Sequence, residues 1–259
     1  MKEKILAKLN EIEEKNDINI IYAAESGSRG WGFASKDSDY DVRFIYIHEP
    51  SWYLKIDQAK DHIENSQGLL DLVGWDTVKT LKLFKKSNPP LFEWLSSPVI
   101  YIEKGNSIKK LKSLMSRYYS PKSCLFHYLS MVKHTKKAYL DKNEIKLKKY
   151  FYAIRPILAC MWIEKFNTMP PMEFNKLLSV QHLDGKLSDR IYLLLKSKIK
   201  GDELNVGNKI VAIDKFIKEK IYYFEDYAVK LNNSKSPGNK ILNELFLEML
   251  SEYWNYDLS

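Results

Sequence analysis

The sequence predicts an α+β domain over residues 1–105, followed by an all-helical domain over residues 106–259. In the first part, short apolar and β-branched runs alternate with apolar residues at helical spacing, as is typical of a sheet flanked by helices. After about Glu103 the strand patterns fade and helical periodicity dominates. This order of patterns favours two domains of different class.

Each element of the first part has its own local pattern. A helix is expected from Lys4 to Glu14, where apolar residues recur on one face. Asp76 has the character of an N-cap for a helix from Thr77 to about Lys86, which Asn88-Pro89-Pro90 ends. Strands are expected at Ile18–Ala24, Asp41–Ile47, Leu69–Trp75 and Val99–Ile102, with a weaker strand pattern at His62–Asn65 and one or two helical turns at Phe92–Leu95.

The second part contains mainly helical patterns. An exposed loop is expected over Asn232–Gly238, because its composition is polar and contains proline and glycine. Helices are expected at Leu125–Tyr139, Ile145–Phe166, Pro171–Leu178, Leu187–Ile199, Lys209–Lys230 and Asn239–Tyr253.

Composition limits the class of protein. The chain has 259 residues, with 45% hydrophobic and 29% charged residues, which are ordinary values for a soluble globular protein. No apolar run of about 18 residues and no secretory signal pattern occurs, so we expect a cytoplasmic protein without a membrane partner. Cys124 and Cys160 stand in apolar company and are expected to be core residues.

The net charge of +8 has two explanations. A surplus of lysine suits polyanionic partners such as nucleotides or nucleic acid. A compositional bias of the genome would produce the same surplus, because the lysines are spread along the chain.

A turn rich in glycine and serine follows the first expected strand. Glycine allows the backbone to approach a ligand closely, so Gly27 and the Ser28 hydroxyl are candidates to hold a phosphate, with Arg29 adding a charged contact. The alternative is a turn that only reverses the chain.

Carboxylates cluster around the next two strands. Asp39 and Asp41 point to the same side of an extended chain, and magnesium is the natural cation to hold two such groups together. Asp71 lies within an apolar strand and is the candidate for a third carboxylate, with Asp76 as its competitor. The alternatives are a polar turn for the first two residues and a water-facing position for Asp71.

The order of these motifs resembles the DNA polymerase β superfamily of nucleotidyltransferases. The order consists of a strand, Gly27-Ser28, Asp39-Tyr40-Asp41 opening a second strand, and a further strand with Asp71. A subfamily of predicted nucleotidyltransferases, some associated with RNA repair, is similar over Ile18 to Leu178. The resemblance is carried by AAESGSRGWGF, DSDYDVRFIY, GWDTVKTLKLFKKSNPPLFEWLSSPVIY and, less specifically, KKYFYAIRPILACMWI.

The resemblance implies a fold, a reaction and a set of roles. The fold would be a mixed sheet flanked by helices, with a helical domain closing over the nucleotide. Gly27 and Ser28 would hold the triphosphate, and Asp39, Asp41 and Asp71 would bind magnesium, with Asp71 also as the base for the attacking hydroxyl. Two magnesium ions are expected, and manganese is the alternative metal.

The implied reaction is transfer of a nucleoside monophosphate from a nucleoside triphosphate to an acceptor hydroxyl. An RNA end, a protein and a small molecule are all candidate acceptors. The alternative function is a catalytically silent module that binds nucleotides or nucleic acid.

Further basic residues are candidates for the nucleotide site. Arg43 follows Asp41 on the same strand face and either contacts phosphate or neutralises the carboxylates. Lys149, Tyr150 and Arg155 are expected on one long helix, either as a basic and aromatic face for the nucleotide or as a solvated face. Glu25 either orients Arg29 or is an ordinary charge at a strand end.

Overall fold

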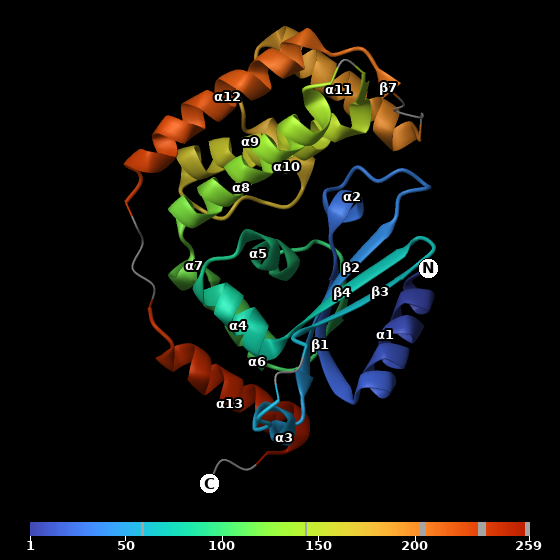
Figure 1. Ribbon diagram of the computed structural model, residues 1–259, viewed down its shortest axis with the longest axis vertical. Helices are drawn as coiled ribbons and strands as arrows, with labels where there is room; N and C mark the ends of the chain where they lie inside the picture. Colours follow the sequence, from blue (N-terminus) through green and yellow to red (C-terminus); the bar gives the residue numbers. More distant parts are fainter. Residues whose placement is uncertain (58–59, 143, 202–205, 233–236, 257–259) are drawn as a thin grey trace. The chain divides into compact units, whose positions relative to one another are not determined.

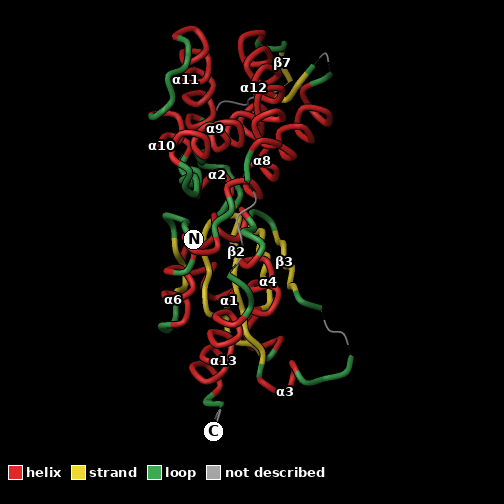
Figure 2. The backbone as a smooth tube through the Cα atoms, turned by 90° about the vertical axis from the view of Figure 1, so that its left-hand side faces the viewer, coloured by secondary structure: helices red, strands yellow, loops and turns green. Residues whose placement is uncertain are grey.

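The computed structural model describes residues 1–57, 60–142, 144–201, 206–232 and 237–256 (Figures 1 and 2). The chain divides into two compact units. Unit 1 consists of Met1–Gly30, Asp39–Tyr118 and Ser236–Ser259. Unit 2 consists of Trp31–Ser38 and Tyr119–Lys235. This division differs from the expected boundary after residue 105, because a short early segment packs in unit 2 and the last helix packs in unit 1.

Unit 1 contains a mixed five-stranded sheet with the order β3-β4-β2-β1-β5. β2 and β4 run parallel, whereas the other neighbouring strands run antiparallel. All the expected strands are present, so the α+β class is confirmed. Their bounds are Ile18–Glu25 (β1), Tyr40–His48 (β2), His62–Gln67 (β3), Leu70–Asp76 (β4) and Ile100–Glu103 (β5).

The two faces of the sheet carry different helices. Helix α1 (Lys2–Asn16) buries its apolar side against alternate side chains of β2, including Val42 and Phe44. Figure 1 shows α1 on one side of the sheet and α4 and α5 on the other. Because side chains alternate along a strand, Asp41 and Arg43 lie on the face opposite α1.

Unit 1 contains further helices besides α1. They are α2 (Gly27–Gly30), α3 (Pro50–Tyr53), α4 (Thr77–Lys85), α5 (Pro89–Leu95), α6 (Ser107–Ser113), α7 (Met115–Tyr118) and α13 (Lys240–Trp254). The expected helix from Thr77 is thereby confirmed, and its N-cap is Asp76.

Helix α13 belongs with the sheet and not with the helical unit. It contacts α6, α4 and β2. The Glu252 carboxylate accepts hydrogen bonds from the backbone N–H groups of Asn106 (2.6 Å) and Ser107 (3.1 Å), at the start of α6. These contacts join two segments that are far apart in sequence, and helical periodicity alone contains no information about such pairing.

Unit 2 is mainly helical. Its elements are α8 (Pro121–Thr135), the π-helix η1 (Lys136–Leu140), β6 (Ile145–Lys146), the 3-10 helix η2 (Leu147–Tyr150), α9 (Phe151–Phe166), α10 (Phe174–Ser179), α11 (Gly185–Lys200), β7 (Val206–Gly207) and α12 (Val211–Lys230). The helix expected from Ile145 therefore begins at Phe151, because Ile145–Lys146 pairs with β7 instead. Part of the loop expected at Asn232–Gly238 lies outside the described residues.

The segment Trp31–Ser38 is part of the core of unit 2. Phe33 packs against Phe151 and Phe174, with ring centroids 4.9 and 5.4 Å away. The Phe174 N–H donates to the Trp31 carbonyl (2.9 Å). The two cysteines are buried and unlinked, as expected. None of the described helices is long and apolar enough to span a bilayer.

Candidate active site

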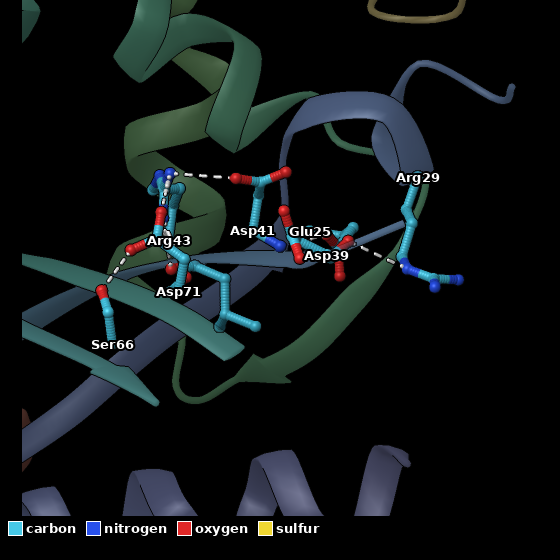
Figure 3. A network of polar contacts seen from close by, with 8 residues as sticks. Glu25, Arg29, Asp39, Asp41, Arg43, Ser66 and Asp71 are labelled. Atoms are coloured by element: carbon cyan, nitrogen blue, oxygen red, sulfur yellow. Dashed lines mark hydrogen bonds and ion pairs between the residues drawn. The ribbon is translucent and has the colours of Figure 1, made fainter. Parts of the chain in front are cut away.

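The candidate site lies in unit 1 at one end of the sheet, where β1 ends and β2 and β4 begin (Figure 3). Asp41 of β2 is paired with Asp71 of β4 in the parallel register. Paired residues on adjacent parallel strands point to the same face of a sheet. The fold therefore brings these two predicted carboxylates together.

Arg43 joins the two carboxylates. Its Nη2 donates to Asp71 Oδ2 (2.8 Å) and lies 3.4 Å from Asp41 Oδ1, while its Nη1 donates to the Asp71 carbonyl (2.9 Å). The Ser66 hydroxyl of β3 donates to the other oxygen of Asp71 (2.6 Å). Arg43 thus pairs with both carboxylates, and its contact with a phosphate stays a prediction.

The two carboxylates differ in their proton affinity. Burial raises the pKa of Asp41 above its ordinary value; nearby Arg43 opposes this shift, whereas the charges of Asp71 and Asp39 add to it. Burial also acts to raise the pKa of Asp71, but hydrogen bonds from Ser66 and Arg43 outweigh it and lower that pKa. Negative charge is therefore less well compensated at Asp41 than at Asp71.

Glu25 is a fully buried acid beneath Asp41. Its Oε1 accepts a hydrogen bond from the Asp41 backbone N–H (2.7 Å), and its Oε2 accepts one from the Tyr101 hydroxyl. Burial raises the pKa of Glu25. Its hydrogen bonds thus fix the backbone of Asp41. This contact differs from the two expected roles of Glu25, which were to orient Arg29 or to be an ordinary charge at a strand end.

Gly27 lies against the carboxylate of Asp41. Its φ is +58°, and a Cβ at this position would lie 2.0 Å from Asp41 Oδ2. The Ser26 N–H also donates to the Asp41 carbonyl (2.7 Å), which ties the turn to β2. Asp41 therefore requires a glycine here whether or not a phosphate is bound. Ser28 follows in the same short helix, α2, and phosphate binding by this turn stays a prediction.

Arg29 and Asp39 lie beside this turn. The Arg29 Nε donates to the Asp39 carbonyl (3.1 Å), and its guanidinium carbon lies 3.6 Å from the centroid of the Tyr40 ring. The Asp39 side chain is exposed in the loop before β2. Within the described ranges, no three His, Cys, Asp or Glu side chains converge closely enough to hold a metal ion. The three predicted ligands thus share one end of the sheet without their carboxylates meeting.

Asp76 lies at the opposite end of β4 from Asp71. Its Oδ1 accepts from the Val78 N–H (2.7 Å), and its Oδ2 accepts from the Tyr53 hydroxyl (2.7 Å). The prediction that Asp76 is a helix N-cap is confirmed, and the structure places only Asp71 beside Asp41.

Two of the three residues predicted to form a basic and aromatic face, Tyr150 and Arg155, are buried in unit 2. The buried Tyr150 hydroxyl accepts from the Ile210 N–H (2.9 Å) and lies 3.1 Å from an Asp214 oxygen. The buried Arg155 Nε donates to the Met172 carbonyl (3.2 Å), and the guanidinium lies over the Trp31 ring. These two side chains stabilise unit 2 internally.

Lys149 is the remaining member of that set. It precedes α9, in η2, and lies near the rings of Tyr139 and Tyr152. Both tyrosines stand in lysine-rich surroundings in the sequence.

Comparisons with known proteins agree with the motif order. A family model described as "RlaP: RNA repair pathway DNA polymerase beta family" matches residues 1–248. The chain is 44% identical to the uncharacterized protein YcgL of Bacillus subtilis (strain 168), over 98% of each chain. A solved nucleotidyltransferase-like protein from Exiguobacterium sibiricum 255-15 is similar over 97% of this chain and 88% of its own. The sequence identity with that protein is 10%, and the TM-score is 0.32. Because the family match spans nearly all of the sequence, the chain belongs to the RNA repair pathway DNA polymerase beta family, and its family and fold are those of a polymerase-β-like nucleotidyltransferase.

Proposed function

We propose that this chain transfers a nucleoside monophosphate from a nucleoside triphosphate to an acceptor hydroxyl. The observation that carries the proposal is the fixed position of Asp41. Glu25 holds its backbone, Gly27 leaves space for its carboxylate, and Asp71 stands beside it in register. Catalytic groups held in place before the substrate arrives lower the barrier of phosphoryl transfer. The end of an RNA is the first acceptor to test, given the family description.

Asp39, Asp41 and Asp71 are the residues that would hold divalent metal, magnesium first and manganese second. Carboxylate oxygens are the hard ligands that such ions prefer. The raised pKa of Asp41 supports the fit, because a nearby cation would relieve the repulsion from Asp71 and Asp39. Two bound ions would lower the pKa of the acceptor hydroxyl and neutralise the leaving pyrophosphate.

The residues of the chain would bind substrate and move one proton. Gly27 and Ser28 would contact the triphosphate. Its negative charge would offer Arg43 a further anionic partner besides Asp41 and Asp71, so that Arg43 would release Asp71. The acceptor oxygen then forms a bond to the α-phosphorus, the bond from that phosphorus to the bridging oxygen breaks, and pyrophosphate leaves. Asp71 takes the proton of the hydroxyl.

The test compares three aspartate-to-asparagine variants, using α-labelled triphosphates and RNA oligonucleotides with free hydroxyl ends. Asp41→Asn should lower transfer at least about 100-fold, because the group that carries charge stabilisation is lost. Asp71→Asn should also lose transfer but keep most of its triphosphate binding, since Asp39 and Asp41 remain. Chelation of divalent metal should stop the reaction in every active sample.

Asp76→Asn is the matched control, because Asp76 is a carboxylate of the same strand, β4, at its opposite end. Transfer should survive in this variant. Its stability should fall by about 1–3 kcal/mol, since the Tyr53 hydroxyl loses the carboxylate that accepts its hydrogen bond. An active Asp71→Asn together with an inactive but folded Asp76→Asn would reverse the assignment of the third carboxylate.

The second candidate function is nucleotide binding without transfer. The ion pair between Arg43 and Asp71 favours it, because Arg43 already compensates the charge of one carboxylate without metal. Magnesium separates the two candidates. In the transferase, magnesium should raise triphosphate affinity in a titration calorimeter, whereas in a simple polyanion binder it competes and lowers affinity.

A further inference from the structure

The positive charge of the protein belongs to unit 2. Within its bounds the sequence has 23 Lys and Arg against 13 Asp and Glu, a net charge of +10. Unit 1 has 18 basic against 20 acidic residues, a net charge of −2. Unit 1 also contains 15 lysines, but its acidic residues offset them, whereas those of unit 2 do not. The asymmetry therefore favours a polyanionic partner of unit 2.

Much of the excess of lysine over acidic residues lies between the end of α8 and the start of α9. Residues 133–149 contain seven lysines and two acidic residues. Lys133 pairs with Glu225 and Lys136 pairs with Asp141, which leaves a clear positive excess. The same stretch includes the π-helix η1. Such helices are rare and often occur at functional sites.

Two exposed tyrosines flank one of these lysines. The Lys149 Nζ lies 4.1 Å from the ring centroid of Tyr139 and 4.9 Å from that of Tyr152. The two tyrosines are 39% and 43% exposed. The edge-on ring of Trp31, 5.5 Å from Tyr152, supports the second tyrosine from within unit 2. We call Tyr139, Lys149 and Tyr152 the tyrosine–lysine patch.

We propose that the tyrosine–lysine patch binds single-stranded RNA, with bases stacked on the tyrosine rings and a phosphate near the Lys149 ammonium. The choice of RNA as the polymer rests on the proposed function. Aromatic rings beside lysines suit a single strand, because its bases are free to stack and its backbone carries the charge. A duplex hides its bases and would use only the lysines.

The experiment measures equilibrium binding to a fluorescein-labelled single-stranded 12-nucleotide RNA by fluorescence anisotropy, without triphosphate. Tyr139→Ala and Tyr152→Ala should each weaken binding about 5- to 150-fold, the usual effect of losing one stacked base. Lys149→Gln should reduce the slope of log K against log salt by about 0.7, the value for one phosphate contact with a single strand.

Matched controls come from α12 of the same unit. Tyr222 is 79% exposed, and Lys218 is also exposed. Tyr222→Ala should change RNA affinity less than about twofold, and Lys218→Gln should leave the salt slope unchanged. Tyr139→Phe and Tyr152→Phe keep the ring and should keep RNA affinity, which separates stacking from misfolding. Circular dichroism and thermal unfolding check each alanine variant.

Several results would overturn the inference. The parent protein could fail to bind single-stranded RNA, or could bind a duplex equally tightly. The folded variants Tyr139→Ala and Tyr152→Ala could bind the RNA as tightly as the parent protein. These variants could also lose triphosphate binding while they keep RNA binding. The test is independent of transfer. If the parent protein has no transferase activity but the patch variants lose RNA binding, only the proposed function is contradicted. If the parent protein is an active transferase but the patch variants bind RNA normally, only the proposed role of the tyrosine–lysine patch is contradicted.

Discussion

Gly27 shows how a missing side chain determines the position of a carboxylate. In Gly27→Ala, the new Cβ would overlap Asp41 Oδ2, so the carboxylate has to move. We expect transfer and metal-dependent triphosphate binding to fall at least about tenfold, because a displacement of about 1 Å disrupts a preorganised site. Stability should fall by about 1–3 kcal/mol from the positive φ. Activity assays and thermal unfolding measure the two effects separately.

Gly68→Ala is the control for this substitution. Gly68 also has a positive φ (+59°), but a Cβ there would meet no atom within 4 Å. It should lose a similar amount of stability and keep its activity. Equal activity in both variants would show that Asp41 does not depend on the turn.

Alternation along a strand predicted that Asp39 and Asp41 share a side, but β2 begins at Tyr40 and Asp39 lies in the loop before it. The apolar run around Asp71 correctly indicated a strand, which lies next to β2. The contacts of Arg43 and Ser66 with Asp71 could not be predicted in this way. They depend on which strands become neighbours, and a single sequence does not specify strand order.

At the scale of elements, local patterns located most helices and strands in the described part of the chain. They failed where long-range pairing overrides propensity. Ile145–Lys146 continues a helical pattern, yet its backbone pairs with Val206–Gly207. A two-residue bridge of this kind leaves no periodic signal. The burial of Tyr150 has the same cause, because its hydroxyl partners lie at Ile210 and Asp214.

The capping of α6 by Glu252 gives a prediction that depends on pH. Burial acts to raise the pKa of Glu252, but the hydrogen bonds from Ser107 and Asn106 outweigh it and lower that pKa. A lowered pKa in the folded state means that the carboxylate stabilises the fold above its ordinary pKa, and that this contribution is lost as pH falls through the lowered value. Glu252→Gln should cost about 1 kcal/mol at pH 7, as for a lost helix cap.

Urea unfolding at several pH values measures this contribution. The difference in stability between the parent and Glu252→Gln should shrink as pH falls below about 4. Glu244→Gln changes an exposed acid of the same helix and should have little effect at any pH. A constant difference across the acid range would mean that the carboxylate charge has no part in the cap.

At the scale of the whole molecule, the sequence predicted the two classes of structure but not which segments combine. Helix α13 looks like any other amphipathic helix, so its periodicity suggested the helical domain. Its docking is decided by contacts with residues more than a hundred positions earlier, such as Asn106. The segment Trp31–Ser38 is too short to show a pattern of its own, and Phe33 finds its partners at Phe151 and Phe174.

Leu245→Ala tests the assignment of α13 to unit 1. Leu245 is fully buried, so truncation should destabilise the unit in which it lies by about 2–5 kcal/mol. Hydrogen exchange should accelerate at the amides of the sheet, α4 and α6, with α9 and α12 unchanged. Leu247→Ala, at a position that is 42% exposed, is the control and should change little. Faster exchange in α9 and α12 would instead assign α13 to the helical unit.

Neither unit is one uninterrupted stretch of chain, and this has a consequence for the order of biosynthesis. Of the five strands of the sheet, β1 is synthesised first. The segment Trp31–Ser38 of unit 2 follows it, and the other four strands come after that segment. Helix α13 emerges only after every helix of unit 2. The part of the molecule that is translated first is thus completed last. Until α13 arrives, the nascent sheet lacks the helix that contacts α4, α6 and β2, so a trigger factor or other chaperone has its longest opportunity to bind there.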